Sequence, residues 1–425
     1  MKETAGDSAE ERREFWRQEG IPALLLMLLV CFAYALANPY PRAHFDYTFR
    51  IALALLHGET GLSQPISWLN ELVPFDGKYY SVFPLGSVLS MVPVAVVQQL
   101  RGTAVFPARE VVSLAAGTTA LFLWMLSGRY RLSPVRRVLL VLLVLLGSWL
   151  WCNSAYGGAW QIALQVAVLG QCGALAFSLI YRQPVLAGFF FAVGFGNRTE
   201  ILLTAPLYLY LLLRPDPKTS GMTAVSWAVH LRREWRTVAG FCLFPLLLGL
   251  GTLWYNFVRF HSFTDFGYAR IPGVLEESWY RYGIFSLRYL PQNIQAMLFS
   301  SSWQAGSDYP FLRPEPFGGS VLSVCPYLLL LMRRERCDPA LCRVAWVAIG
   351  ILTFILWIHG NAGGWQFSYR YASVLLPWFF VLFLEARGAM PEDARDPAGN
   401  FLLAISVLLN AWACYQFYWS GAFRV

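Results

Sequence analysis

Residues 21–37 read IPALLLMLLVCFAYALA, and residues 138–151 read VLLVLLVLLGSWLW. Neither run contains a charged residue. A helix needs about 20 predominantly apolar residues to cross the ~30 Å hydrocarbon core of a bilayer, and each run covers most of that thickness. The two runs therefore predict helices that lie in a membrane, and they decide the fold class.

The composition of the whole chain agrees with this prediction. Of its 425 residues, 57% are hydrophobic and only 14% are charged, whereas soluble domains carry roughly 25% charged residues. We expect an all-α polytopic membrane protein made of one domain, 1–425, without internal repeats. The eight cysteines are scattered, which argues against a disulfide scaffold. The net charge of +8 lies in short loops and indicates topology, not nucleic-acid binding.

Apolar runs divide the chain into about eleven predicted spanning helices. These are 20–38, 108–127, 138–152, 159–181, 185–197, 201–214, 237–256, 319–333, 344–359, 372–386 and 401–421. Two of them, 185–197 and 201–214, are short enough to form one broken hairpin instead. A twelfth run, 84–100, is ambiguous, and the charge of the following loop favours a helix that lies on the membrane surface.

The distribution of basic residues predicts the orientation. Lysines and arginines concentrate in alternate connections, as expected for the cytoplasmic side. The segments 1–20, 128–137, 182, 214–236, 333–343 and 387–400 hold 20 of the 33 Lys and Arg residues. This pattern places the amino-terminal segment 1–19 in the cytoplasm and leaves two large outer loops, 39–107 and 257–318. The candidate functional residues lie on this outer side.

An acidic residue follows the first predicted helix. The stretch HFDYTFRIALALLHGE (44–59) is amphipathic, and Asp46 lies near its start beside His44 and Arg50. A partly desolvated carboxylate at this boundary could accept a proton from an attacking hydroxyl group. Asp is also a favoured residue for capping the start of a helix. Both interpretations of Asp46 stay open at this point.

The stretch PFDGKYYSVFPLGSVLS (74–90) adds polar residues directly before an apolar run. Asp76 is a second acid, Lys78 is a compact donor suited to phosphate, and a helix start would add partial positive charge. Tyr79 and Tyr80 suit a sugar ring or a position at the lipid–water interface equally well.

Two arginines lie on the predicted outer side, although basic residues concentrate on the cytoplasmic side, and their position requires an explanation. Arg198 lies in the sequence NRTE (197–200), and Arg370 lies in GGWQFSYRY (363–371) next to Tyr369. Binding a lipid phosphate is one reason, and pairing with a carboxylate such as Glu200 is the other. The second large loop adds Asp265 and Tyr268.

Taken in order, these stretches resemble the GT-C superfamily of integral-membrane glycosyltransferases, which use polyprenyl-phosphate-linked sugars. Within it, they resemble the type of the dolichyl-phosphate-mannose and aminoarabinose transferases. The resemblance covers most of the chain and rests on Asp46 after the first helix, DGKYYSVFPLG (76–86), RTE (198–200), NFVRF (256–260), DFGY (265–268) and GGWQFSYRY (363–371).

The resemblance implies a bundle of about eleven helices with juxtamembrane helices on the outer face. It implies an enzyme that transfers a hexose or pentose, with inversion, from a polyprenyl phosphate to a lipid or glycan acceptor. Asp46 would be the catalytic base, and Lys78 and Arg370 would hold the donor phosphate. Arg198, Asp76, Tyr79, Tyr80, Asp265, Tyr268 and Tyr369 are further candidates for substrate binding.

The resemblance also sets expectations about cofactors and location. No cofactor is certain, and the metal is unknown. A divalent metal is not supported, because CNSAYGG (152–158) lacks the second acid that a metal-dependent member would use. The expected location is a bacterial inner, or plasma, membrane with the site on the periplasmic or extracellular side. A noncatalytic assembly or scaffold protein is one alternative function, and a transporter or flippase of lipid-linked saccharides is the other. Such a protein would place ionisable residues near the bilayer midplane.

Overall fold

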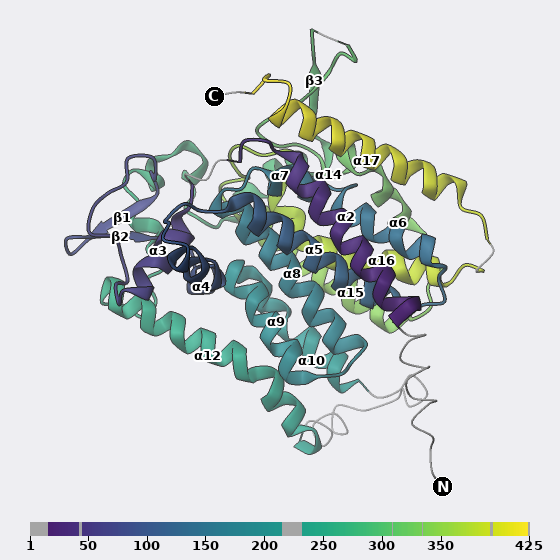
Figure 1. Ribbon diagram of the computed structural model, residues 1–425, viewed down its shortest axis with the longest axis horizontal. Helices are drawn as coiled ribbons and strands as arrows, with labels where there is room; N and C mark the ends of the chain where they lie inside the picture. The colour runs from purple at the N-terminus through teal and green to yellow at the C-terminus, as the bar shows by residue number, and fades with distance from the viewer. Residues whose placement is uncertain are drawn as a thin grey trace.

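The computed structural model describes residues 16–41, 45–214, 232–307, 309–333, 335–391 and 394–423. Expectations for residues 1–15, for His44 and for 215–231 of the basic loop lie outside this part of the chain. Within it the structure is mostly helical, with two short antiparallel hairpins (Figure 1). The expected all-α class is therefore confirmed in its general form.

Among the described residues, seven helices are long and apolar enough to cross a membrane. They are α2 Ile21–Ala37, α5 Ala108–Ser127, α8 Ala159–Leu179, α12 Trp235–Phe260, α15 Pro339–Ile358, α16 Leu376–Gly388 and α17 Pro397–Tyr418. α16 reaches a spanning length through the 3-10 turn η10 Arg370–Leu375 that leads into it. Helices satisfy their backbone polar groups internally, which lipid requires. The seven helices suggest an integral membrane protein.

The count of about eleven crossings stays a prediction, because the other predicted crossings form short or broken helices. α6 Pro134–Leu145 and α7 Trp149–Ala155 meet at a bend of 53°. They add an eighth span only if this bent pair is counted as one crossing. The remaining segments are α9 Pro184–Asn197, the pair η2 Thr199–Thr204 and α10 Ala205–Leu213, and the pair α14 Val321–Val324 and η9 Pro326–Met332. Hydropathy marks these runs as apolar without showing where they break.

Glycines bring three helices into close contact. A Cβ added at Gly170 of α8 would lie 2.4 Å from the backbone nitrogen of Gly194 in α9. A Cβ added at Gly86 of α4 Leu85–Leu100 would lie 2.4 Å from the Cα of Gly196, also in α9. Small residues at helix crossings allow backbones to approach closely in membrane proteins. α9 therefore packs between α8 and α4.

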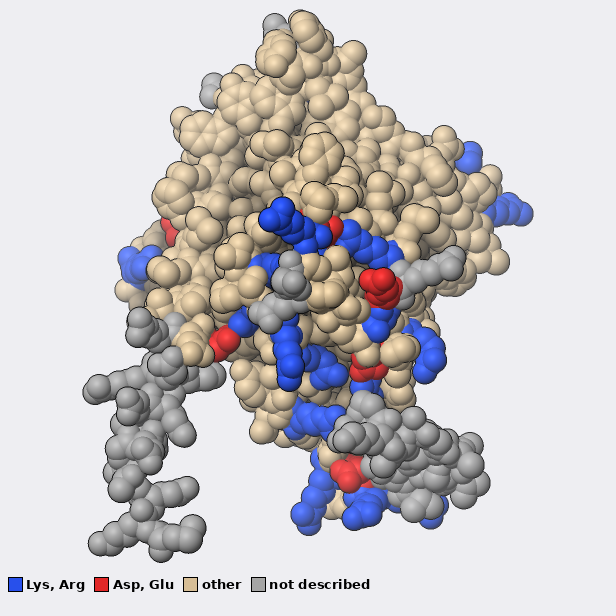
Figure 2. Space-filling model, turned by 90° about the vertical axis from the view of Figure 1, so that its right-hand side faces the viewer, with Lys and Arg blue, Asp and Glu red and all other residues tan. Residues whose placement is uncertain are grey.

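The two ends of the bundle differ in chemistry. One end, which we call the basic end, carries the arginines Arg129, Arg137, Arg214, Arg333 and Arg387. Figure 2 shows lysine and arginine side chains gathered on this side of the molecule. Carboxylates hold several of them in place, as in the 2.7 Å pairs Arg137–Glu19 and Arg333–Asp396. This end corresponds to the loops that the sequence places in the cytoplasm.

The opposite end, which we call the hairpin end, carries α3 Tyr47–Leu56 and the hairpin of β1 Leu72–Phe75 and β2 Lys78–Ser81. A second hairpin, β3 Trp303–Ala305 with β4 Leu312–Pro314, protrudes near the carboxyl end of α17 (Figure 1). α4 begins beside Gly196, and Phe106 beyond its end contacts Phe49 at 5.1 Å between ring centroids. Both connections of α4 thus lie at the hairpin end, whereas its depth in a membrane stays a prediction.

Burial separates inner from peripheral helices. The most apolar stretch of the span formed by η10 and α16 is 89% buried, whereas that of α12 is only 6% buried. α12 packs mainly on α9 and leaves Leu246, Leu250 and Trp254 exposed. An exposed apolar face of this kind is suited to contact with lipid chains. α12 therefore lies at the rim of the bundle.

Candidate functional site

The β1–β2 hairpin fixes the first group of candidate residues. Asp76 and Gly77 connect the strands with φ of +46° and +71°, the pair of positive values typical of a two-residue type I′ turn. The exposed Asp76 carboxylate lies 2.8 Å from Nε2 of His261, which directly follows α12. Asp76 thus forms the turn and contacts the end of α12.

Lys78 follows the turn and lies on the surface. Its ammonium pairs with Glu59, and both side chains are largely exposed. The hydrogen bond from Lys78 to Glu59 raises the pKa of the lysine. Exposed pairs of this kind contribute little free energy. Arg370 donates to the carbonyl of Trp365, and the expected convergence of Lys78 and Arg370 on one phosphate stays a prediction.

The two tyrosines of β2 point to different surroundings. Tyr80 is buried and packs against Phe260 of α12 at 5.5 Å between ring centroids. Tyr79 is partly buried against the cluster that contains Tyr47 and Phe83. In addition, Arg259 of α12 donates a 2.6 Å hydrogen bond to the carbonyl of Ser81. The hairpin is therefore held against α12 by packing and by a buried guanidinium.

Asp46 directly precedes α3 at the N-cap position, but its side chain makes no capping hydrogen bond. Instead, its carboxylate accepts a 2.9 Å hydrogen bond from Nε of Arg50, one turn further along. Asp46 is only 1% exposed, whereas the Arg50 side chain is 28% exposed. The structure therefore shows Asp46 as the buried member of an ion pair, and the capping alternative does not describe its side chain.

The two outer arginines come together around one aromatic ring. The guanidinium carbons of Arg198 and Arg370 lie 4.6 and 5.0 Å from the centroid of the Tyr371 ring. Arg198 also pairs with Glu200 at 2.9 Å, as the structural alternative expects. Arg370 is buried, donates to the carbonyl of Trp365, and its Nε finds no hydrogen-bond partner in the described chain. A buried cation with a spare donor is suited to an anionic ligand.

Glu71 is a carboxylate that the sequence pattern does not single out. Its Oε2 accepts a 2.9 Å hydrogen bond from the indole Nε1 of Trp160, the second residue of α8. Burial raises the pKa of Glu71, and the nearby charge of Glu277 adds to the rise. The Trp160 hydrogen bond and the charge of Arg370 act in the opposite direction. Glu71 therefore belongs to the surroundings of Arg370.

Hydroxyl and imidazole groups extend this cluster. Tyr268 and Tyr280 share a hydrogen bond between their hydroxyl groups. His359 lies between Tyr280 and Tyr371, with ring centroids 6.1 and 6.2 Å away. Burial raises the pKa of Tyr280 to about 12, so its hydroxyl keeps its proton at neutral pH. These groups can donate hydrogen bonds to a polar ligand.

We call the set Glu71, Trp160, Arg198, Arg370 and Tyr371 the polar cluster. Sequence reasoning finds its two arginines, because they break the charge bias. It includes Tyr371 only as the last residue of GGWQFSYRY (363–371), and it misses Glu71 and Trp160, whose only signal is a polar or aromatic residue at the predicted outer end of a helix or loop. What distinguishes these residues is their contacts, Glu71 with Trp160 and Tyr371 with both arginines, which a single sequence does not reveal.

Two other candidates have structural partners. Asp265 accepts hydrogen bonds from Gly267 N at 2.7 Å and from Arg270 Nε at 2.6 Å. Burial alone would raise the pKa of Asp265, but these donors and the Arg270 charge hold it below the ordinary value. Tyr369 is 1% exposed, and its hydroxyl donates to the carbonyl of Leu356. Both residues therefore shape the loops around the cluster.

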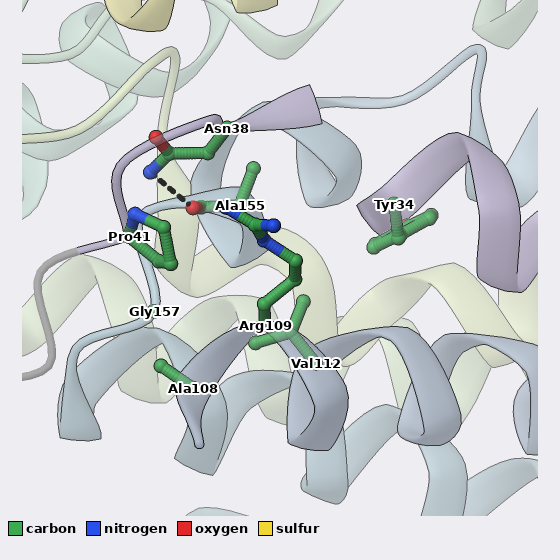
Figure 3. A pocket seen from close by; sticks show the side chains of 8 residues that line it. All are labelled: Tyr34, Asn38, Pro41, Ala108, Arg109, Val112, Ala155 and Gly157. Atoms are coloured by element: carbon green, nitrogen blue, oxygen red, sulfur yellow. Dashed lines mark hydrogen bonds between the residues drawn. The ribbon is translucent and has the colours of Figure 1, made fainter. Parts of the chain in front are cut away.

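A small pocket lies elsewhere at the hairpin end, between α2 and α5 (Figure 3). Asn38 and Arg109 line it, and Asn38 donates a 2.7 Å hydrogen bond to the carbonyl of Ala155. The space holds about one water molecule. It contains no residue of the polar cluster and is too small for a sugar.

Within the described residues, no three His, Cys, Asp or Glu side chains are grouped as a metal site would require. Comparison with known proteins gives no relative: no protein-family model, no curated protein and no solved structure matches the chain.

Proposed function

We propose that this protein is a glycosyltransferase that moves a hexose or pentose from a polyprenyl-phosphate donor to a lipid or glycan acceptor at the hairpin end. The observation that carries the proposal is the meeting of Arg198 and Arg370 around Tyr371, with a spare donor on Arg370. Two buried or half-buried guanidinium groups outside the basic end need a ligand or partner, and Glu200 supplies one for Arg198 only.

The chemistry of such a transfer needs few groups. The acceptor oxygen attacks the anomeric carbon, its proton passes to a carboxylate, and the carbon–oxygen bond to phosphate breaks. The electron pair of that bond leaves with the polyprenyl phosphate, and the configuration at the carbon inverts. Cationic groups stabilise the charge that develops on the leaving phosphate. Asp46 is the proton acceptor that the resemblance implies, and Arg370 is suited to the phosphate.

The bundle also offers a surface for the prenyl chain. Leu202 and Leu203 of η2 lie two and three residues after Glu200 and are about half exposed. α12, which leaves an apolar face exposed, packs on α9, the helix that ends directly before Arg198. A donor with its phosphate at Arg370 would therefore have apolar protein surface and membrane lipid beside its tail.

The alternative, a transporter or flippase of lipid-linked saccharides, has less support. In the described spans, charged residues lie near helix ends, as Arg109 and Glu110 of α5 and Arg387 of α16 do. Coupled transporters place such residues near the middle of the bilayer. The polar cluster at one end is better suited to chemistry at a membrane surface.

Binding of undecaprenyl phosphate to the purified protein tests the proposal. A charge-assisted hydrogen bond is worth about 1.5–3 kcal/mol, so Arg370→Ala should weaken binding by about ten- to a hundredfold. Arg370→Lys keeps the charge, loses the planar fork and should fall in between. Arg270→Ala is the matched control, since Arg270 is a partly exposed arginine at the same end that pairs with Asp265.

Catalysis is measured as release of undecaprenyl phosphate from undecaprenyl-phosphate-linked hexoses and pentoses, with a membrane lipid extract as the source of acceptor. Wild-type protein should release the lipid from at least one donor, and Arg370→Ala should release it more slowly. Unchanged binding in both Arg370 variants, together with no release from any donor, would contradict the proposal. Melting temperatures of the variants show that a loss is not caused by unfolding.

A further inference from the structure

Glu71 is oriented by contacts on one side and left open on the other. Its backbone N–H donates to the hydroxyl of Tyr47 at 3.3 Å, and Trp160 donates to its Oε2 at 2.9 Å. Its other oxygen, Oε1, accepts no hydrogen bond from the described residues, and the side chain is half-buried. One oxygen is thus fixed while the other remains available to a ligand.

Asp46 is more deeply buried than Glu71, and its carboxylate is paired with a cation. It is 1% exposed, and its carboxylate is bound to the Arg50 guanidinium at 2.9 Å. The Arg50 guanidinium occupies Oδ1 of this carboxylate. An incoming hydroxyl group would have to displace Arg50 or open the packing around α3 to reach Asp46. A general base must lie within hydrogen-bond reach of the proton that it removes.

Glu71 also lies close enough to Arg370 for their charges to interact. A transfer reaction needs the proton acceptor and the cation that binds the leaving phosphate on the two sides of one anomeric carbon. Glu71 and Arg370 come from the first outer loop and from η10, and the fold brings them into one cluster. Asp76 and Asp265 do not offer this arrangement, because Asp76 pairs with His261 and Asp265 pairs with Arg270.

We propose that Glu71, and not Asp46, takes the proton from the acceptor hydroxyl group. The assignment rests on the proposed function. In the step, the acceptor O–H proton moves to Oε1 of Glu71 as the oxygen bonds to the anomeric carbon. The bond between that carbon and the phosphate oxygen breaks, and polyprenyl phosphate leaves with its electron pair. Glu71 then returns the proton to solvent.

The electrostatics support this role. Burial and Glu277 raise the pKa of Glu71 against the effects of Trp160 and Arg370. Tyr47 and Tyr268, which face Glu71 from α3 and from the second loop, are neutral hydroxyl groups whose own pKa values are raised, first by burial. Asp46 adds a further carboxylate on the α3 side. A carboxylate with a raised pKa is a better base near neutral pH.

The test compares Glu71→Gln with Asp46→Asn, using the same donors, release of undecaprenyl phosphate and separate binding of that lipid. Glu71→Gln should lose about 10²–10⁴-fold in turnover, with lipid binding within about threefold of wild type. Glu59→Gln is the matched control: Glu59 is an exposed glutamate of the same loop that pairs with Lys78, and turnover should not change. Asp46→Asn should retain most of its turnover per folded molecule.

The pH dependence of turnover distinguishes a proton acceptor from a residue with only a structural role, because a structural role would not change the midpoint. Turnover should rise with pH as Glu71 loses its proton, with a midpoint above the ordinary range for glutamate. Glu277→Gln removes a nearby negative charge and should shift that midpoint to lower pH. Wild-type turnover in Glu71→Gln, or a large loss in Asp46→Asn alone, would overturn the assignment and leave the proposed function intact. No turnover by wild-type protein would overturn both.

Discussion

Asp46 and Arg50 lie one helical turn apart on α3, and their unequal exposure determines what a substitution does to stability. Arg50→Ala leaves the Asp46 carboxylate buried without its 2.9 Å partner, since Asp46 is 1% exposed. Breaking a fully buried pair costs about 3–5 kcal/mol, and we expect about 1–3 kcal/mol here because Arg50 is partly exposed to solvent. Asp46→Asn removes the charge as well and should cost less.

The measurement is the melting temperature of the purified protein in detergent. Arg50→Ala should melt lowest, and the double variant Asp46→Asn with Arg50→Ala should recover part of the loss, because it leaves no buried charge. A double variant that melts below Arg50→Ala would contradict the ion-pair account. The same melting data allow turnover in the Asp46 variant to be expressed per folded molecule.

At this scale the sequence shows which residues are unusual without showing what they contact. Arg198 and Arg370 are visible because cations are disfavoured outside the cytoplasmic side, and the structure indeed places both at Tyr371. Glu71 is not visible, because its environment depends on Trp160 and Arg370, which are distant in sequence. Asp46 is visible from its position, yet its pairing with Arg50 and its burial are properties of the fold.

At the scale of elements, the contact between α4 and α9 positions α3 and the β1–β2 hairpin around the polar cluster. A Cβ at Gly86 would lie 2.4 Å from the Gly196 backbone, which cannot yield as a flexible side chain would. Gly86→Ala should therefore push α4 away from α9 and destabilise the protein by about 1–3 kcal/mol, the usual cost of overpacking.

Gly249→Ala in α12 is the control, because a Cβ there meets nothing within 4 Å. Alanine has the higher helix propensity, so this variant should melt at or above the wild-type temperature. Detergent melting curves of the two variants compare them directly. Equal melting of Gly86→Ala and wild-type protein would show that the α4–α9 contact is looser than the structure has it.

Secondary structure is predictable from the sequence where the apolar runs are continuous and less so where they are interrupted. The long runs at 20–38, 108–127 and 159–181 match α2, α5 and α8 closely. The run at 138–152 hides a 53° bend, where Ser148 accepts a hydrogen bond from Leu150 N and starts a new helix. The run at 319–333 breaks at Pro326, whose ring disfavours helix at the preceding residue. Hydropathy averages over such local events.

At the scale of the whole molecule, the two ends of the bundle make opposite predictions for access from outside the cell. Ser133 directly precedes α6 at the basic end, near arginines that the charge rule places in the cytoplasm. Ser63 is exposed in the first loop, at the hairpin end, where the polar cluster lies. If the proposed function is right, the substrates reach the hairpin end from the outer side.

Labelling with a membrane-impermeant maleimide tests this orientation in intact cells. The native Cys337 is exposed and lies near Tyr130 and Gly388 at the basic end, so the variants are built on Cys337→Ser. Ser63→Cys should label in intact cells, and Ser133→Cys should label only after the membrane is permeabilised. In the wild-type background Cys337 should follow the behaviour of Ser133→Cys. The reverse pattern would place the polar cluster in the cytoplasm, where a donor carried on the outer leaflet could not reach Arg370.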